Sequence, residues 1–286
     1  IVRAYFEKNP RSIVIWLCEQ VSVISQIFAK PGSRKGIAVC DFATNKPKDW
    51  SANLASAQTF GRPVLVIINR AFLVSATKYR HIRANVGLIV HDECHSGIGS
   101  TTSCFYDWLN VRHPECKVIG LSATPPQAKE SPHPGLHQVL TRFSIYDAYK
   151  AKVILPLEII WCPYLEHRPS HIECAKLAQH IAMRRSIDKI IVWCGTISNA
   201  EETGMAWATV FSDYVVSVDT SKSKPSHGLF SFDAFIAAKR GILVCAAKHR
   251  EGSDIAGLGL GVFVDGVADR ACTSFVQCAG RVLRLG

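Results

Sequence analysis

The chain has 286 residues, a formal net charge of +10 and a hydrophobic content of 48%. That length holds one large or two ordinary domains, and this composition is typical of a globular protein rather than a disordered one. The sequence contains no apolar run of about 18 residues and does not begin with a signal peptide, which argues against a membrane-spanning or secreted protein and favours a soluble, intracellular one.

The distribution of charge and the cysteine content indicate the kind of partner and the cellular compartment. Residues 1–150 carry 18 Lys and Arg against 10 Asp and Glu, whereas residues 151–286 carry 15 against 13. A basic first half favours a polyanionic partner such as DNA or RNA. The 11 cysteines form no Cys-x-x-Cys pair, and several lie in apolar runs. That pattern indicates reduced thiols in the cytoplasm or nucleus rather than a disulfide framework.

Short apolar runs recur along the first half, with stretches between them that suit helices, such as Glu19–Ala29 and Cys104–Leu109. Because these runs are continuous rather than alternating, they predict strands of a parallel sheet that is covered on both faces. The predicted strands in this half are Ile13–Leu17, Ile37–Cys40, Val64–Ile68, Leu88–His91 and Val118–Leu121.

The same pattern returns after a polar, helix-like stretch, Gln138–Lys150. The strands predicted in the second half are Leu157–Cys162, Ile190–Cys194, Tyr214–Val218, Ile242–Cys245 and Gly261–Val264. Two α/β units follow from this repetition, and we place their boundary near residue 155, giving domains 1–155 and 156–286.

The most informative residues follow the predicted strand Leu88–His91. In an open α/β sheet, ligands bind at the carboxyl ends of the strands, where this strand delivers Asp92 and Glu93. Asp92 is expected to hold Mg²⁺ through water, Glu93 to orient and deprotonate an attacking water, and His95 to transmit the phosphate state. An alternative takes His91 and His95 as zinc ligands, but on a strand they lie about 13 Å apart.

A second zinc hypothesis uses Cys162, His167, His171 and Cys174, which carry suitable side chains but match no common finger spacing. Scattered surface histidines are the competing interpretation.

Two further loops contain candidate residues. Ser122 and Thr124 follow a predicted strand, and their hydroxyls can link the carboxylate site to other elements. Taken without the other motifs, they are better explained by a strand-to-loop turn in which Pro125 ends the strand. Gly252 allows close approach of the backbone to a ligand, and Asp254 is a candidate contact for a ribose or its water network. Taken alone, the loop with Gly252 and Asp254 indicates no particular function.

The end of the chain supplies positive charge. In a predicted helix over Phe275–Leu285, Gln277, Arg281 and Arg284 fall on one face, which offers one amide and two guanidinium groups to a single target such as a phosphate. The alternative, a solvated basic helix end, leaves Gly280 unexplained, because a mid-helix glycine costs about 1 kcal/mol relative to alanine.

Together these segments resemble the superfamily 2 helicases and translocases, in the DExH branch with a DECH box, closest to restriction-enzyme and repair-type DNA motors. The matched segments are Asp92–His95 (motif II), Ser122–Thr124 (motif III), Gly252–Asp254 (motif V) and Gln277–Arg284 (motif VI). Weaker matches are Ser12–Phe28, Val64–Leu73, Lys189–Asn199 and the connecting segment Ser144–Pro156.

This resemblance implies two tandem RecA-like domains with mainly parallel sheets and ATP with Mg²⁺ bound between them. Asp92, Glu93, Arg281 and Arg284 are its implied catalytic residues. The nucleotide contacts include His95, Gly252, Asp254 and Gln277, and Ser122 and Thr124 couple the sites. The loops with Asn69, Arg70 and Thr196 are expected to touch a nucleic-acid backbone, with DNA favoured over RNA.

One departure bears on activity. The family needs a phosphate-binding loop of the form Gly-x-x-x-x-Gly-Lys-[Ser/Thr], and the chain contains none. We expect a fragment that begins after this loop and stops shortly after motif VI, so that the first domain is truncated at its N-terminus and the second at its C-terminus. Such a fragment is expected to be inactive alone. The alternative is a non-catalytic, nucleic-acid-binding pseudo-helicase.

Overall fold

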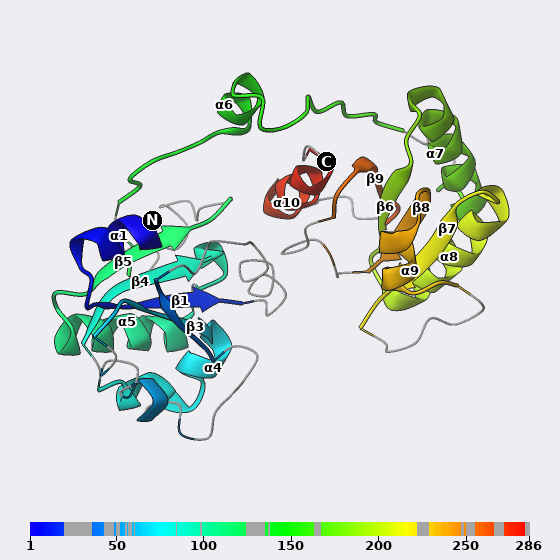
Figure 1. Cartoon of the computed structure of the whole chain (residues 1–286). Coiled ribbons are helices and arrows are strands. Elements are labelled where there is room, and N and C mark those ends of the chain that lie inside the picture. The colour runs from blue at the N-terminus through cyan, green and yellow to red at the C-terminus, as the bar shows by residue number, and fades with distance from the viewer. Residues whose placement is uncertain are drawn as a thin grey trace. The chain divides into compact units, whose positions relative to one another are not determined.

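The structure is a computed structural model, and by its contacts the chain divides into unit 1 (Ile1–Leu140) and unit 2 (Thr141–Gly286) (Figure 1). The sequence suggested a boundary near residue 155, and the division between Leu140 and Thr141 lies upstream of it. No described helix has the length and apolar character needed to cross a membrane. The described residues are 1–19, 36–42, 49, 52–54, 56, 59, 61–83, 85–97, 99–123, 135–136, 138–162, 167–221, 229–246, 249, 255–265 and 272–283.

Unit 1 is built on a five-stranded sheet of order β2-β3-β1-β4-β5, in which every pairing is parallel. All the strands predicted in this half are confirmed, with ends that differ by one or two residues. The elements are α1 (Val2–Lys8), β1 (Ile13–Cys18), β2 (Ala38–Asp41), β3 (Val64–Asn69), α4 (Arg70–Val74), η1 (Ser75–His81), β4 (Val86–Asp92), η2 (Cys94–Gly97), α5 (Ser100–Arg112) and β5 (Lys117–Leu121).

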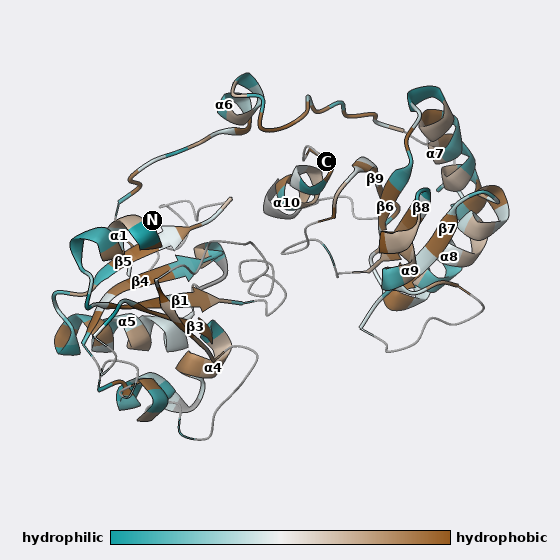
Figure 2. Ribbon diagram, in the orientation of Figure 1, coloured by the Kyte–Doolittle hydropathy of each residue, from teal (hydrophilic) through white to brown (hydrophobic). Residues whose placement is uncertain are grey.

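Successive residues of the central strands point to opposite faces, and both faces are buried. On one face Ile13 and Ile15 pack with Phe105 of α5, while on the other Val14 packs with Phe6 of α1. Figure 2 shows the result as strands that are hydrophobic along their length. Burial on both faces explains why these strands read as continuous apolar runs.

Unit 2 has a four-stranded parallel sheet of order β7-β8-β6-β9. On one face α7 and α8 pack through residues such as Ala178 and Trp207, and on the other α9 and α10 pack through Phe235 and Cys278. The elements are α6 (Ile145–Lys150), α7 (His171–Arg185), β6 (Lys189–Trp193), α8 (Ile197–Val210), β7 (Val215–Asp219), α9 (Phe232–Ala237), β8 (Gly241–Cys245), β9 (Leu258–Phe263) and α10 (Cys272–Val282).

Two predicted elements differ from the structure. Leu157–Cys162 forms no strand, and its apolar side chains are exposed, Trp161 to 81%. Prolines stand at both ends of this run, and because proline has no amide donor they limit ladder pairing. The helix expected over Gln138–Lys150 begins only at Ile145, because Ser144 and Asp147 form a capping box that fixes its start there.

Candidate active site

Asp92 and Glu93 lie at the carboxyl end of β4, which is paired between β1 and β5. We call this side of the sheet, where β1, β3, β4 and β5 end, the carboxyl edge of unit 1. Glu93 has a left-handed backbone with φ of 50°, and its amide donates to Asp92 Oδ1 at 3.1 Å. For a non-glycine residue this conformation is unfavourable, and such strain is concentrated at functional sites.

The surroundings of Asp92 favour a cation. Burial raises the pKa of its carboxyl group, and the neighbouring Glu93 raises it further. A metal ion beside this group would offset the cost of its buried charge. Among the described residues no group of three or more His, Cys, Asp and Glu side chains suits a metal. A single carboxylate still fits Mg²⁺, which keeps several waters and takes other ligands from substrate phosphates.

His95 connects this carboxylate pair to the neighbouring strand. Its Nδ1 lies 3.0 Å from Ser122 Oγ and 3.3 Å from a Glu93 carboxylate oxygen. The register that sets Asp92 beside Leu121 at the end of β5 explains why Ser122 comes within reach. The structure therefore brings Asp92, Glu93, His95 and Ser122 into one cluster, in which the His95 ring lies between the Glu93 carboxylate and the loop after β5.

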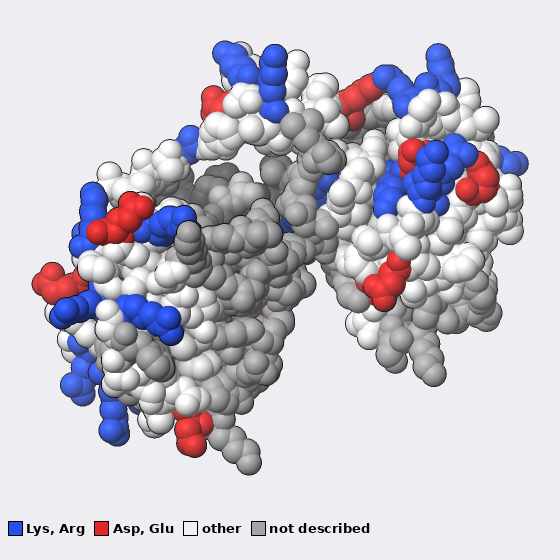
Figure 3. Space-filling model, viewed as in Figure 1, with Lys and Arg blue, Asp and Glu red and all other residues white. Residues whose placement is uncertain are grey.

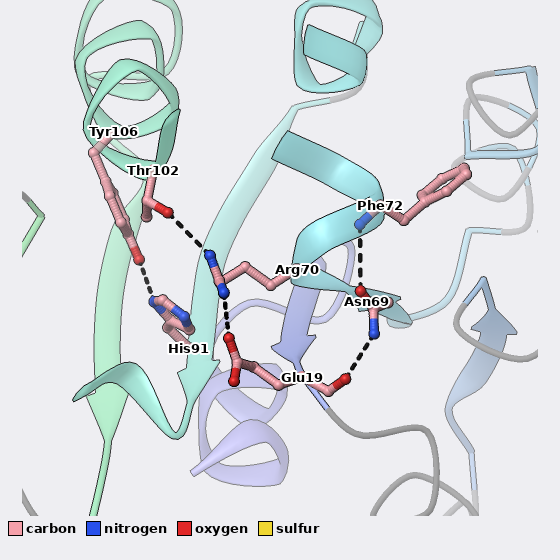
Figure 4. Close-up of polar contacts among 7 residues, drawn as sticks. All are labelled: Glu19, Asn69, Arg70, Phe72, His91, Thr102 and Tyr106. Atoms are coloured by element: carbon pink, nitrogen blue, oxygen red, sulfur yellow. Dashed lines mark hydrogen bonds and ion pairs between the residues drawn. The ribbon is translucent and has the colours of Figure 1, made fainter. Parts of the chain in front are cut away.

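Near this cluster a partly buried polar network ties α4 and α5 to the strand ends (Figure 4). Arg70 forms an ion pair with Glu19 and donates to Thr102 Oγ1 at 3.1 Å. Asn69 donates to the Glu19 carbonyl at 2.7 Å and caps α4. These contacts are internal, so the side chain of Arg70 reaches a nucleic acid only by giving up Glu19.

His91 belongs to the same region rather than to a metal site. The ring is fully buried, and its Nδ1 lies 2.7 Å from the Tyr106 hydroxyl of α5 (Figure 4). Burial raises the pKa of Tyr106, so this hydroxyl stays protonated at neutral pH. This contact holds α5 against β4 at His91, one residue before Asp92. Neither Glu19 nor Tyr106 stood out in the sequence. Their partners are distant along the chain, and nothing in the local sequence marks a contact that forms only on folding.

In unit 2, helix α10 carries the predicted phosphate contacts. Gln277 is largely buried and Arg281 is half-buried. Helical spacing sets both on the side opposite Phe275, Ala279 and Val282, which line an apolar cavity of about 740 Å³. The cavity is therefore separate from the face that Gln277 and Arg281 share.

Two other features mark the carboxyl ends of the strands in unit 2. Thr196 follows β6 and caps α8, its side chain accepting from the Asn199 amide at 3.2 Å. His249, in the loop after β8, has φ of 62°, contacts Asp219 Oδ2 at 2.6 Å and stacks on Phe232 at 4.7 Å. This contact holds His249 beside the end of β7, and sequence inspection missed it.

Several predicted residues lie outside the described part of the chain, namely Thr124, Gly252, Asp254 and Arg284, as does most of the segment after β1 in Ser12–Phe28. The zinc hypothesis for Cys162, His167, His171 and Cys174 gains no support, because no metal-binding group is found among the described residues. His171 contacts Thr203 instead, at 3.0 Å.

Two glycines provide a matched test of how tightly the site is packed. An added Cβ at Gly120 would lie 2.8 Å from Cys94 Sγ and 2.2 Å from Leu136 Cδ1, whereas one at Gly280 meets nothing within 4 Å. We expect Gly120→Ala to destabilise the chain by about 1–3 kcal/mol through overpacking. Gly280→Ala, in a helix interior, should stabilise it by about 1 kcal/mol. Urea denaturation measures both, and an unchanged midpoint for Gly120→Ala would contradict the packing described.

No protein-family model matches the chain, and no curated protein sequence matches it significantly. Its similarity to known proteins is structural. The chain aligns with the Escherichia coli DEAH/RHA helicase HrpB at a TM-score of 0.58 and 15% identity, over 97% of this chain and 36% of HrpB. With the DEAD-box helicase Mss116 bound to ssRNA and UDP-BeF, the TM-score is 0.60 and the identity 14%, over 98% of this chain and 59% of Mss116.

A third similar structure is a fragment of a putative HsdR subunit of a type I restriction enzyme from Vibrio vulnificus YJ016. Its TM-score is 0.57 and its identity 16%, over 100% of this chain and 59% of that one. The chain thus spans only part of each of these proteins. With its two parallel sheets, it has a mixed α/β fold that matches the RecA-like domains of helicases.

Proposed function

We propose that the chain belongs to an ATP-dependent nucleic-acid helicase or translocase of superfamily 2, in its DECH-box branch. The observation that carries this proposal is the cluster of Asp92, Glu93, His95 and Ser122 at the carboxyl edge of a RecA-like sheet. Acidic residues at that edge suit Mg²⁺ and a general base, and the Ser122–His95 contact suits transmission of the nucleotide state. A fold alone does not determine an activity, so these side chains are what support the proposal.

Within this proposal each residue has one task. Asp92 holds Mg²⁺ through water, and Glu93 accepts a proton from the attacking water. Arg281 stabilises charge on the transferred phosphoryl group, and Gln277 contacts the same phosphate. Four residues outside the described part complete the set by resemblance: Thr124 couples the sites, and Gly252, Asp254 and Arg284 contact the nucleotide.

Nucleic acid is the proposed substrate, held mainly through its phosphates by the loops with Asn69, Arg70 and Thr196. Mss116 was solved with ssRNA, whereas HsdR belongs to a restriction enzyme. We favour DNA, because the DECH box and the connecting segment resemble those of DNA motors. ATP hydrolysis requires a phosphate-binding loop that these 286 residues lack. The chain by itself is therefore proposed to be inactive, and hydrolysis is proposed for a longer protein that contains the chain and this loop.

The test is ATP hydrolysis by the full-length protein, measured with single-stranded DNA, duplex DNA and RNA. The proposal expects Mg²⁺-dependent hydrolysis that nucleic acid stimulates and that DNA stimulates more than RNA. The missing loop supports a second candidate, a pseudo-helicase that binds nucleic acid without hydrolysis. Salt-sensitive binding that ATP does not change, with no hydrolysis, would favour that candidate.

A further inference from the structure

A row of cations precedes the strands of unit 1. Arg11 comes shortly before β1, Arg62 before β3, and Arg83 before β4, and β5 itself begins with Lys117. All four side chains are exposed. Because the strands are parallel and pair in the order β3-β1-β4-β5, their starts lie along one edge of the sheet. We call this the amino edge; it is opposite the carboxyl edge that holds Asp92.

Neighbouring elements add to the same charge. Lys8 ends α1 just before β1, Arg112 ends α5 just before β5, and Arg80 lies in η1 on the way to β4. The acidic residues described in these helices and in the connections to the strands are Glu7, Asp107 and Glu115, and Asp49 lies in the connection before β3. Figure 3 shows several Lys and Arg side chains, with fewer Asp and Glu among them, over the left side of unit 1, where the strands begin in Figure 1.

Helix dipoles do not account for this row. A cation at the end of α1 or α5 is favoured by the partial negative charge of a helix C-terminus. The cations before β1, β3 and β4 have no such explanation, because strands carry only small net dipoles.

The corresponding edge of unit 2 provides an internal comparison. There Arg240, just before β8, forms ion pairs with Asp188 and Asp213, which stand before β6 and β7. The arginine on that edge is therefore neutralised by acidic neighbours from adjacent strands. Lys189, which begins β6, and Lys239 also lie on that edge, so the two units differ in the acidic residues placed among the cations rather than in the presence of cations.

We propose that the amino edge of unit 1 is a second contact surface for nucleic acid, which binds the sugar–phosphate backbone without reading bases. From β3 to β5 the edge is about 15 Å wide at the usual strand spacing, which matches the rise of about four base pairs. Arginine dominates it, and the guanidinium fork fits phosphate oxygens. This inference rests on the proposed function only in taking nucleic acid as the partner.

Because the amino edge lies across the sheet from Asp92 and Glu93, contact there needs neither ATP nor its hydrolysis. The surface would hold nucleic acid near the motor while the main contacts at the carboxyl edge are released. Binding through it should depend on salt and should tolerate any base sequence.

The test uses the 286-residue chain and a triple variant, Arg11→Glu, Arg62→Glu and Arg83→Glu. Fluorescence anisotropy with a labelled duplex and the matching single strand gives affinity across a KCl series. We expect a loss of at least tenfold and a slope of log affinity against log salt that is shallower by about 0.9 for each lost phosphate contact on duplex DNA. The triple Arg→Gln variant should show a smaller loss in the same direction, and it replaces the Glu variant if that one does not fold.

The matched control is Lys176→Glu, Arg184→Glu and Lys239→Glu, exposed cations of unit 2 whose reversal changes net charge equally. It should bind nearly as well as the unaltered chain. Unchanged binding by the amino-edge variant, or equal losses in both variants, would overturn this inference and leave the proposed motor activity standing. An unaltered chain that binds polyglutamate but neither nucleic acid would overturn it in favour of an acidic protein partner.

Discussion

The Glu93→Gln substitution is expected to lower nucleic-acid-stimulated ATP hydrolysis by about 10²–10⁴-fold, the usual contribution of a general base. Glutamine has nearly the same shape as glutamate but cannot accept the proton of the attacking water. The strained backbone at this position is the same for both residues, so stability should change little. Hydrolysis is measured by phosphate release in the full-length protein, and nucleotide binding by fluorescence of a labelled ATP analogue.

A matched control is Glu115→Gln, which removes an exposed carboxylate from the loop before β5. That variant should hydrolyse ATP at the unaltered rate. The informative pattern is loss of turnover with retained nucleotide binding in Glu93→Gln alone. Hydrolysis that survives this substitution would refute the role of Glu93 and the assignment of motif II with it.

The second large effect is expected at Arg281. If its guanidinium stabilises the charge that develops on the transferred phosphoryl group, Arg281→Ala should lower turnover by about 10³–10⁵-fold, as for other arginines of this kind. The helix itself should persist, since alanine is the best helix former and Cys278 anchors α10 in the core. Single-turnover hydrolysis separates this effect from nucleotide binding.

Arg281→Lys tests geometry as well as charge. Lysine keeps the positive charge but lacks the planar fork, so only partial activity should return. Arg184→Ala, on the exposed surface of α7, is the control and should be silent. Full activity in Arg281→Ala would show that α10 does not serve the phosphate, and the resemblance to motif VI would then be coincidental.

The strands were predictable because burial on both faces leaves a signal in the local sequence. Leu157–Cys162 carries the same signal but forms no strand, because a strand also needs a partner edge and available amides. At the site, Ser122 was a candidate link to the carboxylates because it follows a buried strand, and the pairing of β4 with β5 brings it to His95 beside Glu93.

Contacts that depend on strand order could not be read from the sequence. Arg70 and Glu19 meet because β3 pairs with β1, and His249 and Asp219 meet because β8 pairs with β7. Each pair is separated by tens of residues, and any ordering of strands is compatible with the same apolar runs. A nucleic-acid role for Arg70 was inferred from its loop position, whereas the ion pair gives it a structural task as well.

At Glu93 the residue that the proposed activity needs is not the residue that best stabilises the left-handed backbone. Glycine adopts this conformation without steric strain, and asparagine tolerates it better than glutamate does. A screen that selects only for resistance to heat or denaturant should therefore favour glycine or asparagine at position 93, and those variants would lose the general base. Thermostable variants from such a screen would keep the RecA-like fold and lack turnover.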